Sequence, residues 1–239
     1  MRSLADLTAA ILVGGFGTRL RPVVADRPKV LAEVRGRPFL TYLLDQAAAA
    51  GLKSVVLCTG YMGDRVQAVF GDTYGGVHLT YSQEVVPLGT AGALHLALPL
   101  LASAPVLIMN GDSFCDTDLQ AFWAWHCARG AEATILLHKT LDTKRYGRVR
   151  VNAVGRVLSF DEKSDNGGSG WINAGIYVLS HRLLLTIPVG REVSLEREMF
   201  PAWIGQGLYG YCGAGRFLDI GTPETYATTE QFFAPETLT

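Results

Sequence analysis

The sequence lacks a strong excess of charge of either sign. Its 239 residues carry a formal net charge of −1, and only 18% of them are charged. Binding to a polynucleotide requires clustered Lys and Arg side chains that neutralise phosphates. We therefore expect no nucleic-acid partner.

Cysteine and long apolar runs are also scarce. The four cysteines follow no CxxC or Cys/His spacing, which excludes a zinc site of the common kinds and a disulfide framework. We expect them to be small core residues in a reducing compartment. No run approaches the roughly 18 apolar residues that a membrane span needs. The sequence thus predicts no membrane partner and a cytoplasmic location.

What the chain does contain is an alternation of aliphatic runs with helical patterns through its first half. This alternation is typical of βαβ units on a mostly parallel sheet. The length is sufficient for one α/β domain that needs no disulfides or structural metal. We predict an α/β fold in three Rossmann-like layers, with a mixed, mostly parallel sheet, in a single domain over residues 1–239.

Individual elements can be predicted from residue type and turn signals. The expected strands are 8–13, 54–59, 77–82, 106–109, 133–138, 147–152, 156–161, 172–179 and 216–220. The expected helices are 38–50, 64–70, 91–101 and 195–205, followed by a last helix with Thr222 as its N-cap and Pro223 at its first position. The strands 147–152 and 156–161 should form a hairpin.

A glycine loop follows the first predicted strand. The segment begins at Leu12 and continues Val-Gly-Gly-Phe-Gly-Thr-Arg-Leu-Arg-Pro, and Pro-Lys follows a few residues later. Glycines at the carboxyl end of a parallel strand let backbone N–H groups approach phosphates closely. Glycine loops also occur in dinucleotide sites and plain turns. The two cations, Arg19 and Lys29, instead favour a triphosphate ligand.

These residues resemble the signature GGxGTRLxP followed by PK of the sugar-nucleotide pyrophosphorylases, the nucleoside-diphosphate-sugar transferase family. The matching positions are Gly14, Gly15, Gly17, Thr18, Arg19, Leu20, Pro22, Pro28 and Lys29. The resemblance implies the fold of that family, with a nucleotide-binding half at about 1–115 and a sugar-binding half at about 116–239. It also implies that Arg19 and Lys29 hold the triphosphate and that the glycine loop, Leu12 and Thr18 bind the nucleotide.

Two aspartates follow strands that lie far apart in the sequence. Asp112 ends the buried run VLIMNGD, and Asp219 lies in FLDIGTP. Mg²⁺ prefers one or two carboxylates together with phosphate oxygens and water. The resemblance implies that Asp112 and Asp219 share a Mg²⁺ ion. Each aspartate on its own is also common in turns and caps, and Asp118 is expected to cap a helix.

The segment YSQEVVPLGTAG resembles the base-reading turn of the family. It places Glu84 against the base, with Gly89 and Thr90 at the start of the next helix. An ionised carboxylate only accepts hydrogen bonds, so it complements the N1–H and N2–H₂ donors of guanine and repels the carbonyls of uracil or thymine. This favours GTP. The alternatives are that Gln83 turns inward or that Glu84 is solvated.

Three further segments resemble the acceptor-sugar site of the family. Glu162 and Asn173 would bind sugar hydroxyls, Lys163 would pair with the sugar phosphate, and Gly147 would allow close backbone approach. Glu162 and Lys163 can also be read as a solvated charge pair on a hairpin. The glycine-rich stretch 166–170 beside them is either a mobile loop over the site or an ordinary hairpin loop.

The sequence therefore predicts a Mg²⁺-dependent transferase that joins GMP from GTP to a sugar 1-phosphate and releases pyrophosphate. The chain also contains PLGTAGAL, NGDSF followed by DxDL, INAGIYV, SLEREMFP and FLDIGTPE. With these segments and its compact length it resembles, over nearly the whole sequence, short bacterial guanylyltransferases that act on D-glycero-α-D-manno-heptose 1-phosphate, so that sugar is favoured. A mannose 1-phosphate guanylyltransferase and a uridylyl- or thymidylyltransferase are alternatives. A regulator without activity and a glycosyltransferase that uses Asp116 and Asp118 are less favoured. A homo-oligomer is compatible with the sequence.

Overall fold

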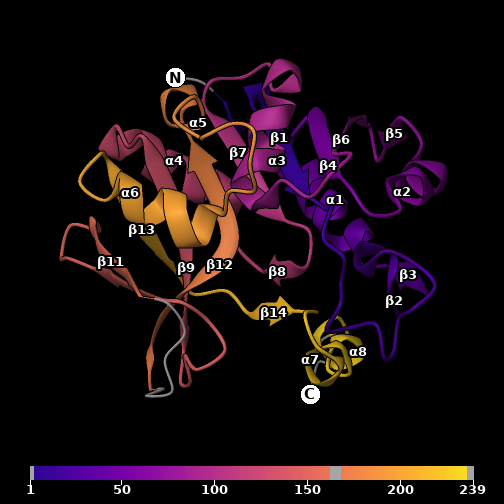
Figure 1. Cartoon of the computed structure of the whole chain (residues 1–239). Coiled ribbons are helices and arrows are strands. Elements are labelled where there is room, and N and C mark those ends of the chain that lie inside the picture. The colour runs from indigo at the N-terminus through magenta and orange to yellow at the C-terminus, as the bar shows by residue number, and fades with distance from the viewer. Residues whose placement is uncertain (1–2, 162–167, 236–239) are drawn as a thin grey trace.

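The computed structural model describes residues 3–161 and 168–235. Its centre is a ten-stranded mixed sheet, in which eight strands follow the order β11-β10-β12-β7-β1-β4-β6-β5 (Figure 1). The other two extend the sheet from β12: β9 pairs with β12, and β13 pairs with β9. The strands of this sheet are β1 (Thr8–Leu12), β4 (Ser54–Thr59), β5 (Thr73–Tyr74), β6 (Val77–Gln83), β7 (Val106–Asn110), β9 (Ala133–Thr140), β10 (Arg148–Val151), β11 (Val157–Asp161), β12 (Gly170–Leu179) and β13 (Leu208–Gly213).

The four strands β7, β1, β4 and β6 are parallel to one another, and β13 is parallel to β9. Strand β12 runs antiparallel to both β7 and β9, which makes the whole sheet mixed. This agrees with the predicted fold class. Two small ribbons lie outside the sheet: β2 (Glu33–Val34) pairs with β3 (Arg37–Pro38), and β8 (Ser113–Cys115) pairs with β14 (Phe217–Asp219).

Helices cover both faces of the sheet. Successive residues of a strand point to opposite faces, and in β1 the side chain of Ile11 belongs to one hydrophobic cluster while Ala10 belongs to the other. The cluster around Ile11 includes residues of α1 (Leu40–Ala49), α2 (Gly63–Phe70) and α4 (Leu119–Arg129). The cluster around Ala10 includes residues of α3 (Gly89–Ala97), α5 (His181–Leu184) and α6 (Phe200–Trp203). The three predicted layers are therefore present.

The capping chemistry explains where several helices begin. The Asp118 carboxylate accepts hydrogen bonds from Gln120 N and Ala121 N at the start of α4, as predicted. The Thr222 side chain caps α7 (Pro223–Tyr226), in which Pro223 is the first residue, also as predicted. The last helix is α8 (Thr229–Phe232). In the described part of the chain, no helix is long and apolar enough to cross a membrane.

Several predicted elements were wrong in their bounds or type. Pro38 lies in β3, so α1 begins at Leu40 and not at residue 38. The predicted helix 195–205 is a π-helical turn, Leu195–Met199, followed by the short α6. Strand β13 was missed because its glycines interrupt the strand pattern. Of the cysteines expected in the core, Cys58 and Cys115 are buried, whereas Cys212 is exposed.

Candidate active site

The glycine loop and Asp112 meet at the carboxyl ends of two neighbouring parallel strands. Residue Gly111 follows β7, and its N–H donates to the carbonyl of Leu12 at the end of β1 over 2.9 Å. A Cβ atom on Gly111 would lie 2.5 Å from that carbonyl oxygen, so only glycine allows the two strand ends to come this close. The contact places the carboxylate of Asp112 beside the loop, at the edge where open parallel sheets bind ligands.

Asp112 is paired with one of the two predicted phosphate-binding cations. The Nζ atom of Lys29 lies 2.5 Å from Asp112 Oδ2. Burial raises the pKa of Asp112, but attraction to Lys29 and the hydrogen bond from it outweigh burial, and Arg19 acts in the same direction. The pKa of Asp112 is therefore below its usual value, and the carboxylate stays ionised.

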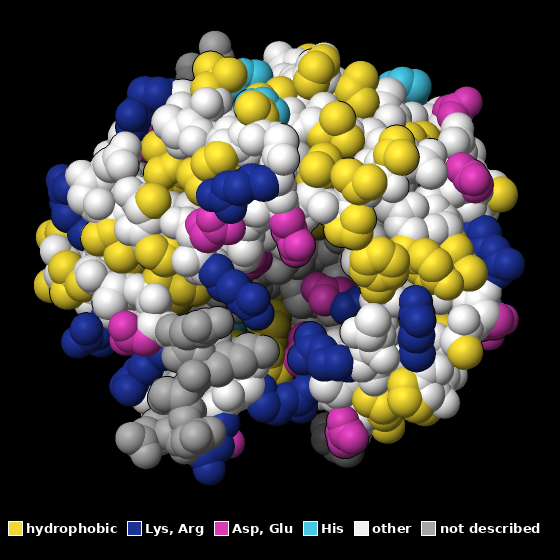
Figure 2. Space-filling view, in the orientation of Figure 1, with side chains coloured by type: hydrophobic (Ala, Val, Ile, Leu, Met, Phe, Trp, Pro, Cys, Tyr) yellow, Lys and Arg dark blue, Asp and Glu magenta, His cyan; other side chains and the backbone are white. Residues whose placement is uncertain are grey.

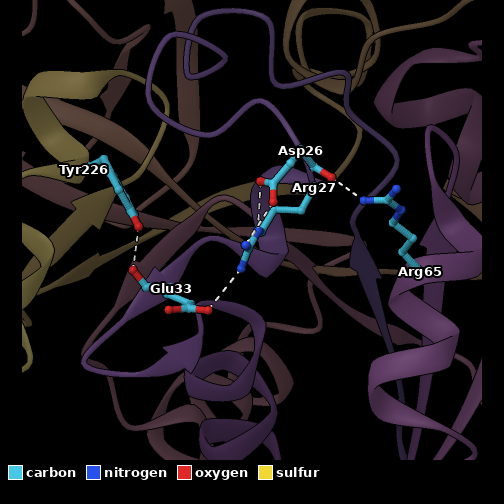
Figure 3. Close-up of polar contacts among 5 residues, drawn as sticks. All are labelled: Asp26, Arg27, Glu33, Arg65 and Tyr226. Atoms are coloured by element: carbon cyan, nitrogen blue, oxygen red, sulfur yellow. Dashed lines mark hydrogen bonds and ion pairs between the residues drawn. The ribbon is translucent and has the colours of Figure 1, made fainter.

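The segment that carries Lys29 is fastened on both sides, as Figure 3 shows. The Arg27 guanidinium pairs with Asp26 and with Glu33, each at 3.0 Å. Arg65 of α2 donates to the carbonyl of Asp26, and Tyr226 of α7 donates to the carbonyl of Glu33. Exposed ion pairs add little stability singly. Together they hold the segment 26–33, which includes the 3-10 turn Lys29–Leu31, between α2 and α7.

The ribbon of β8 and β14 brings Asp219 to the same place from the far end of the chain. Asp219 is the cross-strand partner of Ser113, and Ile220 N donates to the carbonyl of Asp112 at 2.9 Å. The Asp219 side chain accepts hydrogen bonds from Gly221 N and from the Tyr146 hydroxyl. Arg19 approaches this turn as well, since a Cβ on Gly221 would lie 3.4 Å from its Nη2.

Two adjoining cavities open where these elements meet. The larger, about 680 Å³, and the smaller, about 370 Å³, share several lining residues. Figure 2 shows a hollow near the centre of one face, with acidic and basic side chains gathered around it. The shared lining residues are Gly89, Thr90, Asn110, Asp112, Glu192 and Glu196. We call the smaller one the loop cavity and the larger one the ribbon cavity.

Most of the described residues predicted from the sequence line one of these cavities or both. The loop cavity is lined by Leu12, Gly14, Gly15, Lys29, Glu84, Gly89, Thr90 and Asp112. The ribbon cavity is lined by Arg19, Gly89, Thr90, Asp112, Gly147, Asn173 and Asp219. Among the described residues, Gly17 and Thr18 were predicted to bind nucleotide but line neither cavity. Glu162, Lys163 and residues 166–167 of the predicted flexible stretch lie outside the described residues.

The carboxylate of Glu84 is held in the loop cavity by backbone. Its Oε2 accepts a hydrogen bond from Leu88 N at 3.0 Å. Its Oε1 lies so close to the chain that a Cβ on Gly60 would be 2.6 Å from it. Burial raises the pKa of Glu84, the bond from Leu88 lowers it, and repulsion by Glu192 raises it, so that the pKa lies above its usual value. Glu84 therefore points inward and is not fully solvated.

The sequence analysis missed several polar residues of the site. Glu196 lies in the π-helical turn and lines both cavities, as does Asn110, and Ser113 lines the ribbon cavity. Asn110 and Ser113 flank Asp112 in NGDSF, and Glu196 lies in SLEREMFP; both segments belong to the family resemblance. That resemblance was the available signal, but it assigned no role to these three residues.

Some of the hydrogen-bonding groups of Asn173 and Thr90 are used by contacts within the protein. The amide of Asn173 donates to the Tyr177 hydroxyl at 2.7 Å, and its oxygen accepts from Gly175 N at 2.9 Å. The Thr90 hydroxyl donates to Glu196 at 2.9 Å and accepts from Leu195 N at 2.8 Å. Each side chain keeps some capacity for a ligand, since an amide has two donors and its oxygen two lone pairs, and the Thr90 hydroxyl oxygen has a second lone pair.

Comparison with known proteins places this arrangement in a family. A model of the family described as "Nucleotidyl transferase" matches residues 8–236. The chain belongs to this family. A mannose-1-phosphate guanylyltransferase of Mycobacterium tuberculosis is 39% identical over 92% of this chain and 63% of its own length. The chain thus spans about three fifths of the curated relatives of this kind.

Two further proteins match this chain almost end to end. The D-glycero-alpha-D-manno-heptose 1-phosphate guanylyltransferase of Aneurinibacillus thermoaerophilus is 33% identical, and the match covers 94% of this chain and 97% of the relative. A crystal structure of HddC from Yersinia pseudotuberculosis complexed with GMP-PN has a TM-score of 0.84 at 28% identity, covering 95% of this chain and all of that one. The predicted family and fold are thereby confirmed.

Proposed function

We propose that this chain transfers GMP from GTP to a sugar 1-phosphate, giving a GDP-sugar and pyrophosphate, in the two adjoining cavities. The observation that carries the proposal is the convergence of Arg19, Lys29, Asp112 and Asp219, from three distant parts of the chain, on neighbouring cavities. Guanylyltransferases among the relatives act on this class of substrate.

The loop cavity would take the nucleotide. It is bordered by the glycine loop and ends at Glu84, whose carboxylate is turned inward. Only the ionised carboxylate complements the two donors on the guanine edge. This supports GTP over UTP or dTTP.

The chemistry needs no general base among these residues. A sugar 1-phosphate is largely dianionic at neutral pH because its second pKa is about 6. One of its oxygens attacks the α-phosphorus of GTP, a new P–O bond forms, and the bond from the α-phosphorus to the bridging oxygen breaks as pyrophosphate leaves. Arg19 and Lys29 would offset the charge of the two anions, which must otherwise repel each other. Lys163 would pair with the sugar phosphate.

A Mg²⁺ ion fits the donor set at the boundary of the cavities. Asp112 and Asp219 are carboxylates on adjacent strand ends, and two carboxylates with phosphate oxygens suffice for this ion. No cluster of three or more possible metal ligands occurs in the described part of the chain, so a metal held by protein side chains alone is not supported. When bound, Mg²⁺ would neutralise charge on the phosphates and help orient them.

A glycosyltransferase that uses Asp116 and Asp118 receives no support from the geometry. The carboxylate of Asp118 is used by the helix cap, and Asp116 pairs with Arg216 at 3.4 Å. Neither residue lines the loop cavity or the ribbon cavity. Those two aspartates are therefore structural.

For the sugar we favour D-glycero-α-D-manno-heptose 1-phosphate, because the guanylyltransferase for that sugar matches this chain along nearly the full length of both. Mannose 1-phosphate is the second candidate, supported by the higher identity of its guanylyltransferase. Purified protein should be incubated with Mg²⁺, each of four NTPs and a panel of sugar 1-phosphates. We expect pyrophosphate release to be highest with GTP and one of these two sugar 1-phosphates. No release with any pair of NTP and sugar 1-phosphate would contradict the transferase function.

A further inference from the structure

A buried tyrosine hydroxyl links three polar side chains of the site. Tyr177 of β12 is fully buried. Its hydroxyl accepts hydrogen bonds from Asn173 Nδ2 at 2.7 Å and from Asn110 Nδ2 at 3.2 Å. With both lone pairs engaged, the hydroxyl proton is left to point at Glu196 Oε1, which lies 3.5 Å away.

The carboxylate of Glu196 is held firmly on its other side. Its Oε2 accepts from the hydroxyls of Thr90 at 2.9 Å and Ser194 at 3.0 Å. The turn that carries it is π-helical and is tied to α3, because Leu195 N donates to Thr90 Oγ1. Single π-helical turns are rare in proteins overall, but those that occur are frequently found at functional sites. The turn therefore fixes one carboxylate at the boundary of the two cavities.

Among the described residues, two hydrogen-bond acceptors remain unused at this boundary. A carboxylate oxygen can accept two hydrogen bonds, and from residues 3–161 and 168–235 Glu196 Oε1 receives only the long contact to Tyr177. Beside it, Asn110 Oδ1 is buried and has no hydrogen-bond partner within the described residues. Burying an acceptor without a partner costs free energy. A ligand with two neighbouring hydroxyl donors would satisfy both atoms.

The hydrogen bonds of Tyr177 connect these two acceptors to the larger ribbon cavity. The Tyr177 hydroxyl links Glu196 to Asn173. Asn173 lines the ribbon cavity and not the loop cavity, and the same is true of Asp219 and Gly147. We propose that Glu196, with Asn110 beside it, accepts hydrogen bonds from hydroxyls of the sugar 1-phosphate and so selects sugars that carry them. This inference rests on the proposed function, since it requires a sugar 1-phosphate as the second substrate.

The test combines one substitution with changes in the substrate. The wild type and Glu196→Gln are assayed with GTP, the preferred sugar 1-phosphate and each of its monodeoxy derivatives. The substitution keeps the shape but replaces one acceptor oxygen with a donor. Glu196→Gln should lower kcat/KM for the full sugar by about 10- to 100-fold, the range for a hydrogen bond to a charged group. The KM for GTP should change by less than about threefold.

The decisive result is the coupling between the two changes. One deoxy sugar should lose about as much with the wild type as Glu196→Gln loses with the full sugar, and removing that hydroxyl should cost the variant almost nothing more. The matched control is Glu198→Gln in the same turn, which pairs with Arg191 and lines neither cavity. It should keep the wild-type discrimination among the sugars.

Several outcomes would overturn the inference. Equal losses for every deoxy sugar in both proteins would show that Glu196 contacts no sugar hydroxyl. Coupling to 2′- or 3′-deoxy GTP instead would assign it to the ribose. If Glu196→Gln does not fold, as judged by thermal unfolding, then Glu196→Asp must show the same coupling. A wild type inactive with every full sugar would contradict the proposed function itself, whereas an active wild type without coupling would contradict only this inference.

Discussion

The loop cavity and the ribbon cavity are built in different ways. The lining of the first includes the contiguous run 12–16 of the glycine loop, together with Glu84, whose carboxylate is held by a backbone N–H. The second is lined by side chains from β7, β12, β14 and the π-helical turn, which are far apart in the sequence. A site made from a local motif can be recognised in the sequence. A site made from side-chain networks becomes visible only when the chain is folded.

The largest loss of activity is expected from a substitution at the boundary between the two cavities. We expect Asp112→Asn to lower turnover by about 10²- to 10³-fold, because it removes a charge that would hold Mg²⁺ and that positions Lys29. Steady-state pyrophosphate release measures the effect. Circular dichroism should show an intact fold.

Asp116→Asn is the matched control for Asp112→Asn. Asp116 lies directly after β8, pairs with Arg216 and lines neither cavity. Its substitution should leave turnover within about twofold of the wild type, as is usual for an exposed ion pair. Near wild-type activity of Asp112→Asn would show that the metal assignment is wrong.

The base-reading side of the comparison can be tested at Glu84. We expect Glu84→Gln to lower kcat/KM for GTP by about 10- to 100-fold, because a charged acceptor for the guanine donors is lost. The ratio of UTP to GTP use should rise, since the amide can donate to a uracil carbonyl. Parallel assays with both nucleotides provide the measurement. An unchanged ratio would remove Glu84 from base recognition and make the loop cavity a phosphate site only.

A smaller effect is expected at Tyr146, on the ribbon side. Its hydroxyl donates to Asp219, and its ring packs edge-on against Phe217 at 5.7 Å. Tyr146→Phe keeps the ring and removes one hydrogen bond that orients the carboxylate. Turnover should fall by roughly 3- to 10-fold, in line with the net contribution of about 0.5 to 1.5 kcal/mol of a typical single hydrogen bond. A Mg²⁺ titration of both proteins checks this, and an identical titration curve would contradict an orienting role.

The smallest expected effect is a pH dependence that differs between the two cavities. Burial raises the pKa of Glu84, so this carboxylate takes up a proton at a higher pH than an ordinary glutamate. Recognition of guanine needs the ionised form, which exists above that pKa. The KM for GTP should therefore rise a few-fold as the pH falls towards it, and the KM for the sugar 1-phosphate should not follow. A profile that Glu84→Gln leaves unchanged would assign the pH dependence to another group.

How far the sequence predicts the molecule depends on how local each feature is. Strand β4 and the Asp118 cap follow from residue type and spacing within a few positions. Strand β13 does not, because Gly210 breaks its pattern, yet a Cβ there would lie only 2.5 Å from Leu137. The glycine is required by packing between strands that meet only in the fold.

The same distinction holds within the site. Asp112 was predictable because it ends a buried strand beside the glycine loop. The approach of Asp219 was expected from family resemblance and depends on the pairing of β14 with β8, two strands of three residues each. Glu196 lies in the segment SLEREMFP, which resembles the family, but the sequence assigned it no role, since its role depends on Thr90 and Tyr177, which lie 106 and 19 residues away in the chain.

The most direct test of the proposed reaction follows oxygen atoms. Sugar 1-phosphate labelled with ¹⁸O in its non-bridging phosphate oxygens is incubated with GTP, Mg²⁺ and the wild-type protein, and the products are weighed by mass spectrometry. Direct attack of the sugar phosphate on the α-phosphorus predicts that all label is retained in the GDP-sugar and none enters pyrophosphate. Label in pyrophosphate, or GTP breakdown that leaves the labelled sugar phosphate unchanged, would contradict the transfer.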